Sequence, residues 1–283
     1  MTKNYTLSGI KVNVAELEVL IQKSAVDTVS KDELQLALSL VDLTTLEGKD
    51  TDEKVKELSR KAIVTGVAAV CVYPSLVAVA KNELKNSDKK VASVAGGFPS
   101  GQLPLSLRLE EAKYAIAQGA DEIDMVISRG KFLEGNYQFV FDEVVAFKEV
   151  CGGVTLKVIL ETGELETLDN IKIASEIAIQ AGADFIKTST GKMSINATLP
   201  AIGVMLQCIR SHFESTGKRV GIKPSGGISD GKTAAHYLRL TELIVGKEWL
   251  NPALFRFGAS RLVDNLISEI SGKSTNNSAS NGY

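Results

Sequence analysis

Short apolar runs with β-strand character alternate with amphipathic helical segments along most of the chain, and this alternation limits the fold most. Several runs are almost continuously apolar, as expected for parallel strands that helices cover on both faces. The runs are at residues 36–43, 67–73, 90–98, 122–127, 155–160, 185–190, 220–227 and 255–260. Helical patterns separate them and another follows the last, which predicts an α/β fold of the (β/α)8 or TIM-barrel type.

A doubly wound open sheet is the rival fold for such an alternation. Its usual dinucleotide fingerprint, GxGxxG directly after the first strand, is absent from this chain. A run of eight strands also favours closure into a barrel. We therefore predict the closed form.

The chain divides into three regions at the precision that sequence patterns allow. Residues 1–35 carry helical patterns at 13–25 and 31–38, and we expect a helical extension that packs against an end of the barrel. Residues 36–271 form the predicted catalytic barrel. The last segment, 272–283, is polar and rich in small residues, which is typical of a mobile tail.

The charge balance argues against a polyanionic partner. The 283 residues include 32 Lys and Arg against 34 Asp and Glu, without the basic excess that nucleic acids or anionic membranes attract. No apolar run is long enough to span a bilayer, and the N-terminus lacks the pattern of a signal peptide. We therefore expect a soluble cytoplasmic protein with no nucleic-acid or membrane partner.

The few cysteines and histidines argue against disulfides and against a zinc site. Cys71, Cys151 and Cys208 are an odd number at wide spacing, so we expect reduced thiols. His212 and His236 lie far apart in predicted helices, where we expect them at the surface, whereas zinc enzymes use histidines at defined spacings. The sequence therefore predicts no metal and no cofactor.

Five charged residues interrupt the apolar strands, and they are the strongest functional signal. They are Asp42 and Asp124 on strands one and four, and Lys157, Lys187 and Lys223 on strands five, six and seven. Burying an ammonium is costly unless it is paired. Any one of these lysines could be an edge residue or part of a buried ion pair. Three lysines at similar points of consecutive strands, together with two aspartates, indicate a shared pocket.

Two segments of the chain resemble one another and relate two of these residues. Residues 115–126, AIAQGADEIDMV, and 178–189, AIQAGADFIKTS, each contain a helix end, a Gly-Ala-Asp turn and a strand. Overlaying the turns puts Asp124 and Lys187 at the same strand position. Because inward side chains of alternate strands share a layer in such barrels, we expect both to point into one interior layer.

A lysine in such a pocket can act as a nucleophile on a carbonyl and form a Schiff base. The amine must be neutral to attack, so its pKa must fall from about 10.4 towards neutrality. Burial lowers this pKa, and so does a second cation nearby, which a pair such as Lys187 and Lys223 provides. A carboxylate such as Asp124 would transfer the protons.

Glycine-rich turns follow strands six, seven and eight, at residues 189–192, 225–228 and 258–260. Barrel enzymes often bind a substrate phosphate in the loops after strands seven and eight, through backbone N–H groups. A tight turn alone explains any one of these glycines, but their co-location predicts a phosphate site. Lys192 either adds charge there or is a solvated surface lysine.

The motifs at these positions resemble those of the deoxyribose-phosphate aldolases, which are class I aldolases. The matching stretches run in order at residues 42–46 (DLTTL), 50–55 (DTDEKV), 71–74 (CVYP), 119–127 (GADEIDMVI), 156–165 (LKVILETGEL), 182–192 (GADFIKTSTGK), 221–228 (GIKPSGGI) and 256–260 (RFGAS). FIKTSTG together with KPSGG is specific. The resemblance implies a reversible reaction in which 2-deoxyribose 5-phosphate yields glyceraldehyde 3-phosphate and acetaldehyde.

Carried over residue by residue, the resemblance implies that Lys187 forms the Schiff base. It implies that Lys223 perturbs the pKa of this nucleophile and relays protons with Asp124, while Asp42 and Lys157 make supporting polar contacts. The partners would be a small phosphosugar and acetaldehyde, without a metal or cofactor. A homodimer is compatible with this function, although no interface can be identified from the sequence.

The phosphate-binding residues that the resemblance implies all lie in the glycine-rich turns. They are Gly191, Gly226, Gly227, Gly258 and Ser260. From the same turns we also predict Lys192 at the phosphate site and Thr190 as a supporting active-site residue. Arg261 stands where some relatives have a serine, which could alter phosphate affinity without changing the reaction. Tyr283 ends this chain, and a terminal tyrosine of some members reaches the active site as a proton relay. Here it has either that role or none.

Two other functions compete with the aldolase. A phosphosugar isomerase on the same barrel would use a carboxylate base and need no nucleophilic lysine. A sugar-phosphate-binding protein would have lost catalysis, yet every lysine and aspartate of the predicted machinery is present. The three strand lysines therefore favour the aldolase.

Overall fold

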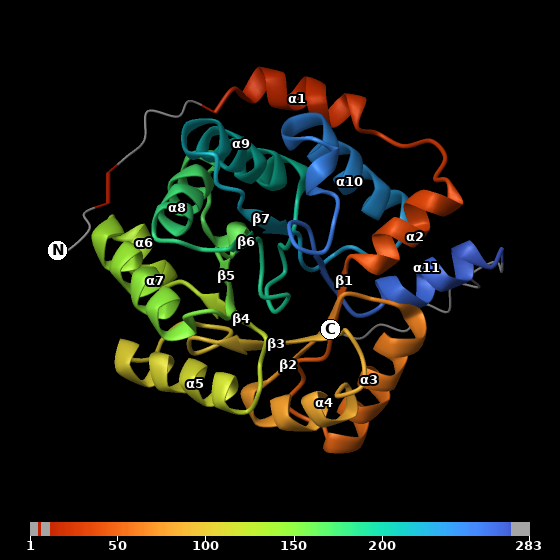
Figure 1. The fold of residues 1–283 in the computed structure, drawn as a ribbon. Helices are drawn as coiled ribbons and strands as arrows, with labels where there is room; N and C mark the ends of the chain where they lie inside the picture. Colours follow the sequence, from red (N-terminus) through yellow and green to blue (C-terminus); the bar gives the residue numbers. More distant parts are fainter. Residues whose placement is uncertain (1–4, 7–11, 273–283) are drawn as a thin grey trace.

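Eight parallel strands form one sheet that curves into a barrel, with helices around it (Figure 1). The computed structural model describes residues 5–6 and 12–272. The strands follow the sheet order β7-β6-β5-β4-β3-β2-β1-β8. They are β1 (Val41–Thr44), β2 (Ala69–Val72), β3 (Lys90–Ala95), β4 (Glu122–Val126), β5 (Thr155–Ile159), β6 (Phe185–Lys187), β7 (Gly221–Lys223) and β8 (Phe257–Ala259).

The first and last strands of this order close the barrel. Parallel bridges join Ile222 to Phe255 and Ser225 to Gly258, and the Arg256 N–H donates to the carbonyl of Ile222 at 3.0 Å. Backbone groups at the two edges of the sheet therefore find partners in each other. The predicted TIM barrel is confirmed.

Helices connect the strands and cover the barrel from outside (Figure 1). They are α3 (Asp52–Thr65), α4 (Val77–Glu83), α5 (Leu105–Ala117), α6 (Arg129–Leu133), α7 (Tyr137–Cys151), α8 (Leu168–Gln180), α9 (Leu199–Thr216), α10 (Gly231–Val245) and α11 (Leu262–Ile270). Several begin at an N-cap residue whose side chain accepts a hydrogen bond from the backbone N–H group three residues further along the chain. This bond satisfies one of the free N–H groups of the first helical turn. These caps are Thr51, Thr167, Thr198 and Asp230.

The first strand is shorter than predicted, because residues 36–39 belong to helix α2 (Lys31–Ser39) and not to a strand. Ser30 and Glu33 form a reciprocal capping box at the start of this helix, which stabilises it. Short apolar runs fit a buried helix and a buried strand equally well, so the run at 36–43 was misassigned. The predicted ranges of the other strands also include loop residues beyond one or both observed ends.

The N-terminal segment packs on the side of the helical ring, not against an end of the barrel. Helix α1 (Val14–Lys23) contacts α9 and α10, and α2 contacts α10 and α11. Leu17 of α1 is 1% exposed and lies against Gly203 of α9, where an added Cβ would be 2.1 Å from the leucine. The small residue therefore allows the close approach of the two helices. The described residues end at Gly272, so the rest of the predicted tail lies outside them.

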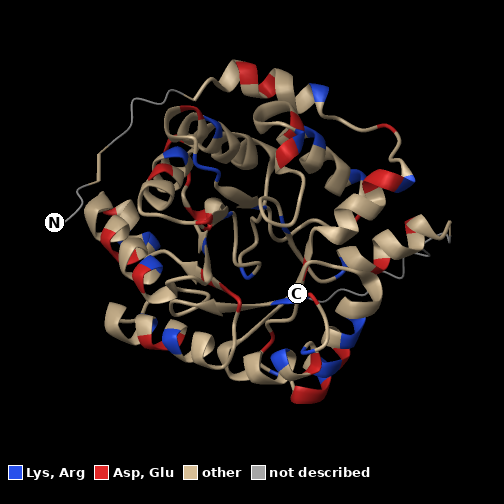
Figure 2. Cartoon of the chain, viewed as in Figure 1, with Lys and Arg blue, Asp and Glu red and all other residues tan. Residues whose placement is uncertain are grey.

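Charged side chains mostly lie on the outer helices, but several lie on the central strands (Figure 2). Cys71, Cys151 and Cys208 are free and buried. His212 and His236 are half-buried instead of being at the surface, and His236 Nε2 lies 3.0 Å from the carbonyl oxygen of Ile21. None of the helices in the described part of the chain is long and apolar enough to cross a membrane.

The docking of α1 can be tested by removing its buried leucine. We expect Leu17→Ala to lower the free energy of unfolding by about 2–4 kcal/mol, since it removes a buried side chain and leaves a cavity at the contact with α9. Val19→Ala is the matched control, because Val19 is 48% exposed on the same helix; its effect should stay below about 0.5 kcal/mol. Urea unfolding measures both, and equal losses would contradict this packing.

Candidate active site

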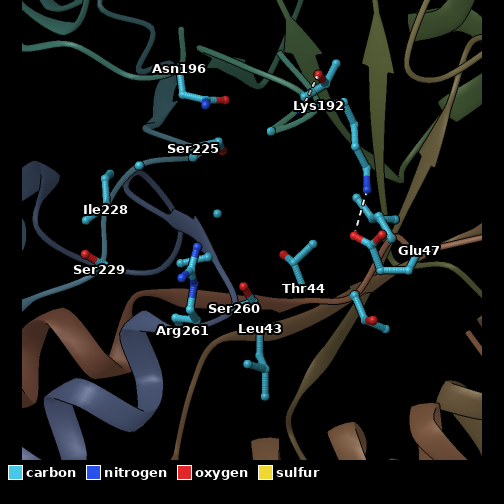
Figure 3. A pocket seen from close by; sticks show the side chains of 18 of the residues that line it. Leu43, Thr44, Glu47, Lys192, Asn196, Ser225, Ile228, Ser229, Ser260 and Arg261 are labelled. Carbon is cyan, nitrogen blue, oxygen red and sulfur yellow. Dashed lines mark hydrogen bonds and ion pairs between the residues drawn. The ribbon is translucent and has the colours of Figure 1, made fainter. Parts of the chain in front are cut away.

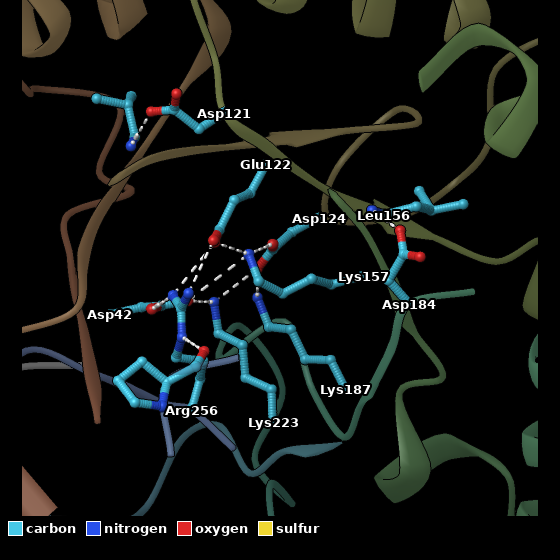
Figure 4. Close-up of polar contacts among 12 residues, drawn as sticks. Asp42, Asp121, Glu122, Asp124, Leu156, Lys157, Asp184, Lys187, Lys223 and Arg256 are labelled. Atoms are coloured by element: carbon cyan, nitrogen blue, oxygen red, sulfur yellow. Dashed lines mark hydrogen bonds and ion pairs between the residues drawn. The ribbon is translucent and has the colours of Figure 1, made fainter. Parts of the chain in front are cut away.

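Charged side chains from five of the eight strands, and from the residue that precedes β8, converge inside the barrel (Figure 4). The five residues that the sequence singled out are among them, and each is at most 3% exposed. The structure adds Glu122 and Arg256, which are also buried. We call these seven residues the ion cluster. Its members are Asp42, Glu122, Asp124, Lys157, Lys187, Lys223 and Arg256.

Asp124 on β4 is the centre of the ion cluster. Its Oδ1 accepts a hydrogen bond from Lys157 Nζ at 2.7 Å, and its Oδ2 accepts from Lys187 and Lys223 Nζ, each at 2.8 Å. One carboxylate therefore holds the amines of three neighbouring strands together. Asp124 and Lys187 were predicted to point into the same interior layer, and they are both buried and joined by a hydrogen bond there.

Asp42 on β1 forms a second centre beside the first. It accepts a short hydrogen bond from Lys223, and its Oδ1 lies 2.6 Å from Arg256 Nη1. Arg256 also donates to Glu122 Oε1 at 2.8 Å, and Glu122 Oε2 lies 2.5 Å from Lys157 Nζ. Each carboxylate of the ion cluster thus bridges two or more basic groups (Figure 4).

The mutual attraction of these charges keeps most of the groups ionised. Burial opposes ionisation of Asp42, but Lys223 and Arg256 outweigh burial and lower the pKa of this carboxyl. The pKa of Asp124 lies well below its ordinary value for the same reason. For Lys157 and Lys223, burial favours the neutral amine, but the carboxylates prevail and raise the pKa of both lysines.

Lys187 differs from the other two lysines in charge and in access. Its pKa is lowered, chiefly because burial penalises the ammonium, and the cation of Lys223 adds to this while Asp124 opposes it. Lys187 also lines the pocket at the end of the barrel, whereas Lys157 and Lys223 are absent from its lining. Lys187 is therefore the amine of the ion cluster that a substrate in this pocket would meet.

The pocket has a volume of about 850 Å³ and is lined by the loops after β1, β6, β7 and β8 (Figure 3). Such loops at the carboxyl ends of the strands form the active sites of TIM-barrel enzymes. The volume is in the range of small-molecule sites. All predicted phosphate-binding residues line this pocket, namely Gly191, Lys192, Gly226, Gly227, Gly258 and Ser260, and so does Thr190, which was predicted to support the active site.

Two glycines of this pocket leave no room for a side chain. Gly226 has φ +76°, and an added Cβ would lie 2.4 Å from Asn196 Oδ1. At Gly258 an added Cβ would lie 2.3 Å from Ser225 Oγ. Both of these side-chain oxygens are buried and have no hydrogen-bond partner in the described part of the chain. Unpaired polar atoms at a pocket wall are available to a polar ligand, because leaving them buried and unpaired is costly.

The cations around the pocket differ in whether they are paired. Lys192 Nζ lies 2.8 Å from a Glu47 carboxylate oxygen, and Lys61 Nζ lies 2.6 Å from Asp264. Within the described ranges, the side chain of Arg261 forms no ion pair and no hydrogen bond, and it extends along the pocket (Figure 3). Arg261 therefore has a free positive charge for an anionic ligand.

A buried carboxylate supports the loop after β6. Glu161 is 0% exposed and has φ 56°, a left-handed conformation that is uncommon for a residue with a side chain. Its Oε2 accepts a hydrogen bond from Thr190 Oγ1 at 2.5 Å and lies 3.2 Å from Arg129 Nη1. Burial raises the pKa of Glu161, while Thr190 and Arg129 oppose this shift. Thr190 therefore points its hydroxyl into the protein and contributes to the loop's shape.

The sequence prediction missed three of these residues. Glu122 and Arg256 are charged residues inside apolar strand runs, which is the same signal that identified the five predicted residues. Nothing in the sequence around Glu161 indicates its positive φ. Tyr283 lies outside the described residues, so its predicted role stays a prediction.

Comparisons with known proteins assign the family. Residues 36–239 match the family model of the DeoC/LacD family aldolases. The human deoxyribose-phosphate aldolase is 44% identical over 289 residues, which cover 93% of this chain and 90% of that protein. The mouse deoxyribose-phosphate aldolase is 46% identical over 254 residues, which cover 83% of this chain and 79% of that protein. The chain belongs to the DeoC/LacD aldolase family, whose members are carbon–carbon lyases.

Solved structures agree with this assignment. The deoxyribose-phosphate aldolase of Aeropyrum pernix, whose structure is described as tetrameric, superposes with a TM-score of 0.69 at 28% identity and covers 89% of this chain and 97% of that one. The aldolase QR15 gives a TM-score of 0.69 at 30% identity, with 83% and 96% covered. The family that the motifs predicted is confirmed, and it favours the aldolase over the isomerase.

The role of Glu161 can be tested by stability measurements. We expect Glu161→Ala to lower the free energy of unfolding by about 1–3 kcal/mol, because it leaves buried donors of Thr190 without their acceptor. Glu164→Ala is the matched control: Glu164 binds the same Arg129 at 2.8 Å but is 35% exposed, so its loss should stay below about 1 kcal/mol. Similar losses in urea unfolding would refute the supporting role.

Proposed function

We propose that this chain is a class I aldolase that reversibly cleaves 2-deoxy-D-ribose 5-phosphate to D-glyceraldehyde 3-phosphate and acetaldehyde through a Schiff base on Lys187. One observation carries the mechanism: Lys187 is the amine of the ion cluster that lines the pocket, and its pKa is lowered. The names of the similar human and mouse proteins support the substrate. Glycine-rich loops on the same pocket suit a phosphate.

In the direction of synthesis, the neutral Lys187 amine attacks the carbonyl carbon of acetaldehyde. The resulting carbinolamine loses water to form an iminium ion, and loss of a proton from the adjacent methyl group gives an enamine. The enamine carbon then bonds to the aldehyde carbon of glyceraldehyde 3-phosphate, and water releases the product from Lys187. Cleavage follows the same steps in reverse.

Asp124 and Lys223 are placed to move the protons of these steps. Asp124 Oδ2 is within hydrogen-bond distance of both Lys187 and Lys223 Nζ, at 2.8 Å each, so it joins the reacting nitrogen to a second proton carrier. Lys223 also supplies a positive charge that disfavours protonation of Lys187. Asp42 and Lys157 hold Lys223 and Asp124 in position.

In this proposal the phosphate of the substrate binds at the glycine-rich turns of the pocket. Gly191, Gly226, Gly227 and Ser260 line the pocket, and Ser225 Oγ is a buried hydroxyl without a hydrogen-bond partner among the described residues. Arg261 adds a charge that no carboxylate of the described residues neutralises. The three free buried cysteines also suit the reducing cytoplasm, which we propose as the protein's location.

Trapping the Schiff base tests the mechanism directly. We expect borohydride with acetaldehyde to leave a stable reduced adduct on Lys187, mapped by mass spectrometry of its peptides, and no adduct on Lys187→Ala. An adduct on Lys157 or Lys223 would keep the reaction class and overturn the assignment of the nucleophile. Folded, active protein without any adduct would refute the Schiff base.

Arg261→Ser tests the phosphate site. We expect KM for 2-deoxyribose 5-phosphate to rise about 10-fold or more, because a charge-assisted hydrogen bond is lost, while turnover of unphosphorylated 2-deoxyribose stays unchanged. Lys61→Ser is the matched control, since it removes an equal charge that Asp264 already neutralises. Equal changes in both variants, or an equal change with the unphosphorylated sugar, would exclude a contact between Arg261 and the phosphate.

A further inference from the structure

The ion cluster holds one more basic group than it holds carboxylates. Its four basic groups are Lys157, Lys187, Lys223 and Arg256, and its three carboxylates are Asp42, Glu122 and Asp124. If every member were ionised, a net positive charge would be buried, which is unfavourable. If one lysine is neutral, the charges cancel. Electroneutrality therefore favours one neutral amine.

Arg256 is the member whose charge is fixed. A guanidinium stays protonated in proteins, whereas a lysine can release its proton. Arg256 is 5% exposed, does not line the pocket, and donates to Asp42 at 2.6 Å and to Glu122 at 2.8 Å. It thus occupies carboxylate oxygens on the side of the ion cluster away from the pocket.

The contacts of the lysines decide which of them gives up its proton. Lys157 has Glu122 at 2.5 Å and Asp124 at 2.7 Å, and Lys223 contacts both Asp42 and Asp124. Among the described residues, Lys187 contacts one carboxylate, that of Asp124, and shares the same oxygen with Lys223. Its ammonium is the least compensated of the three.

The remaining strands add no charge to this balance. Strand β2 contributes Cys71, and burial raises the pKa of its thiol so that it is neutral. Strand β3 contributes Ala92 and Val94, which are in register with Glu122 and Asp124 and carry no titratable group. Nearer the pocket, Glu161 is paired with Arg129.

We propose that Arg256, held by Asp42 and Glu122, is a positioning residue that fixes the charge balance of the ion cluster and so leaves Lys187 as its neutral amine. The inference rests on the proposed use of Lys187 as the nucleophile. Without Arg256, three lysines face three carboxylates. The cluster is then neutral with Lys187 protonated, and the amine loses its reactivity near neutral pH.

Competitive acetylation of the folded protein reads the protonation of Lys187 without requiring catalysis. Acetic anhydride reacts with neutral amines, so the yield of acetylated Lys187, measured by peptide mass spectrometry from about pH 6 to 10.5, follows its titration. We expect Arg256→Met to move this titration upward by about one pH unit or more and to lower the yield at about pH 7 at least 10-fold. At high pH the yield returns to that of the wild type.

A charge-restoring variant separates this effect from structural damage. The double variant Glu122→Gln/Arg256→Met removes one anion and one cation, so we expect the titration of Lys187 to return toward that of the wild type. Glu122→Gln alone removes an anion and should move the titration of Lys187 to a lower pH than in the wild type. Arg256→Lys, which keeps a cation, should stay close to the wild type. If Arg256→Met does not fold, the order in which Lys187 titrates in the other variants still tests whether the charge balance of the ion cluster sets its protonation. Titrations that coincide, or a double variant shifted further than Arg256→Met, would overturn the proposal.

The two proposals fail in different ways. If Lys187 titrates as expected but forms no borohydride-trapped adduct with acetaldehyde, the proposed role of Arg256 stands and the aldolase mechanism fails. If the adduct forms but the titration is the same in all variants, the mechanism stands and the role of Arg256 fails.

Discussion

The carboxylate of Asp124 is the interaction on which the rest of the site depends. It accepts hydrogen bonds from three lysines on consecutive strands, and its neighbours compensate the cost of burying so many charges. A lysine amine inside a barrel is unstable as an isolated ammonium. Here Asp124 and Asp42 stabilise the ammonium ions of Lys157 and Lys223, and Lys187, with the fewest carboxylate contacts, is left closest to neutrality. Reactivity thus follows from an uneven distribution of counter-charges.

The barrel supplies the rigidity that this distribution requires. Strand register fixes Asp124 opposite Lys157, and Lys187 opposite Lys223, so the distances between their charged atoms are set by backbone hydrogen bonds. The loops that follow the same strands build the pocket, which brings Lys187 to its floor and the glycine-rich turns to its wall. Cluster and pocket therefore form one unit, built from the short strands and from the loops at their carboxyl ends.

Much of the fold and site could be predicted from the sequence, because a charged residue inside an otherwise apolar strand can be recognised from the order of the residues alone. A lysine or aspartate in an apolar strand has few explanations, and five such residues identified the cluster. The same rule extended to Glu122 and Arg256 would have found its remaining members. The apolar run at residues 36–43 misled the prediction, because periodicity does not distinguish a short buried helix from a strand, and the capping box at Ser30 decided the outcome.

The barrel, five of the seven members of the ion cluster and the family could be predicted from the sequence alone, because each depends on local periodicity or on contiguous motifs. The folded structure was needed to find which lysine lines the pocket, which carboxylate each amine contacts, that Arg261 has no ion pair within the described residues, and that Glu161 supports Thr190. These properties depend on distances between residues far apart in the chain. Charge balance in a buried cluster is a sum over all its members, so no single segment of sequence contains it.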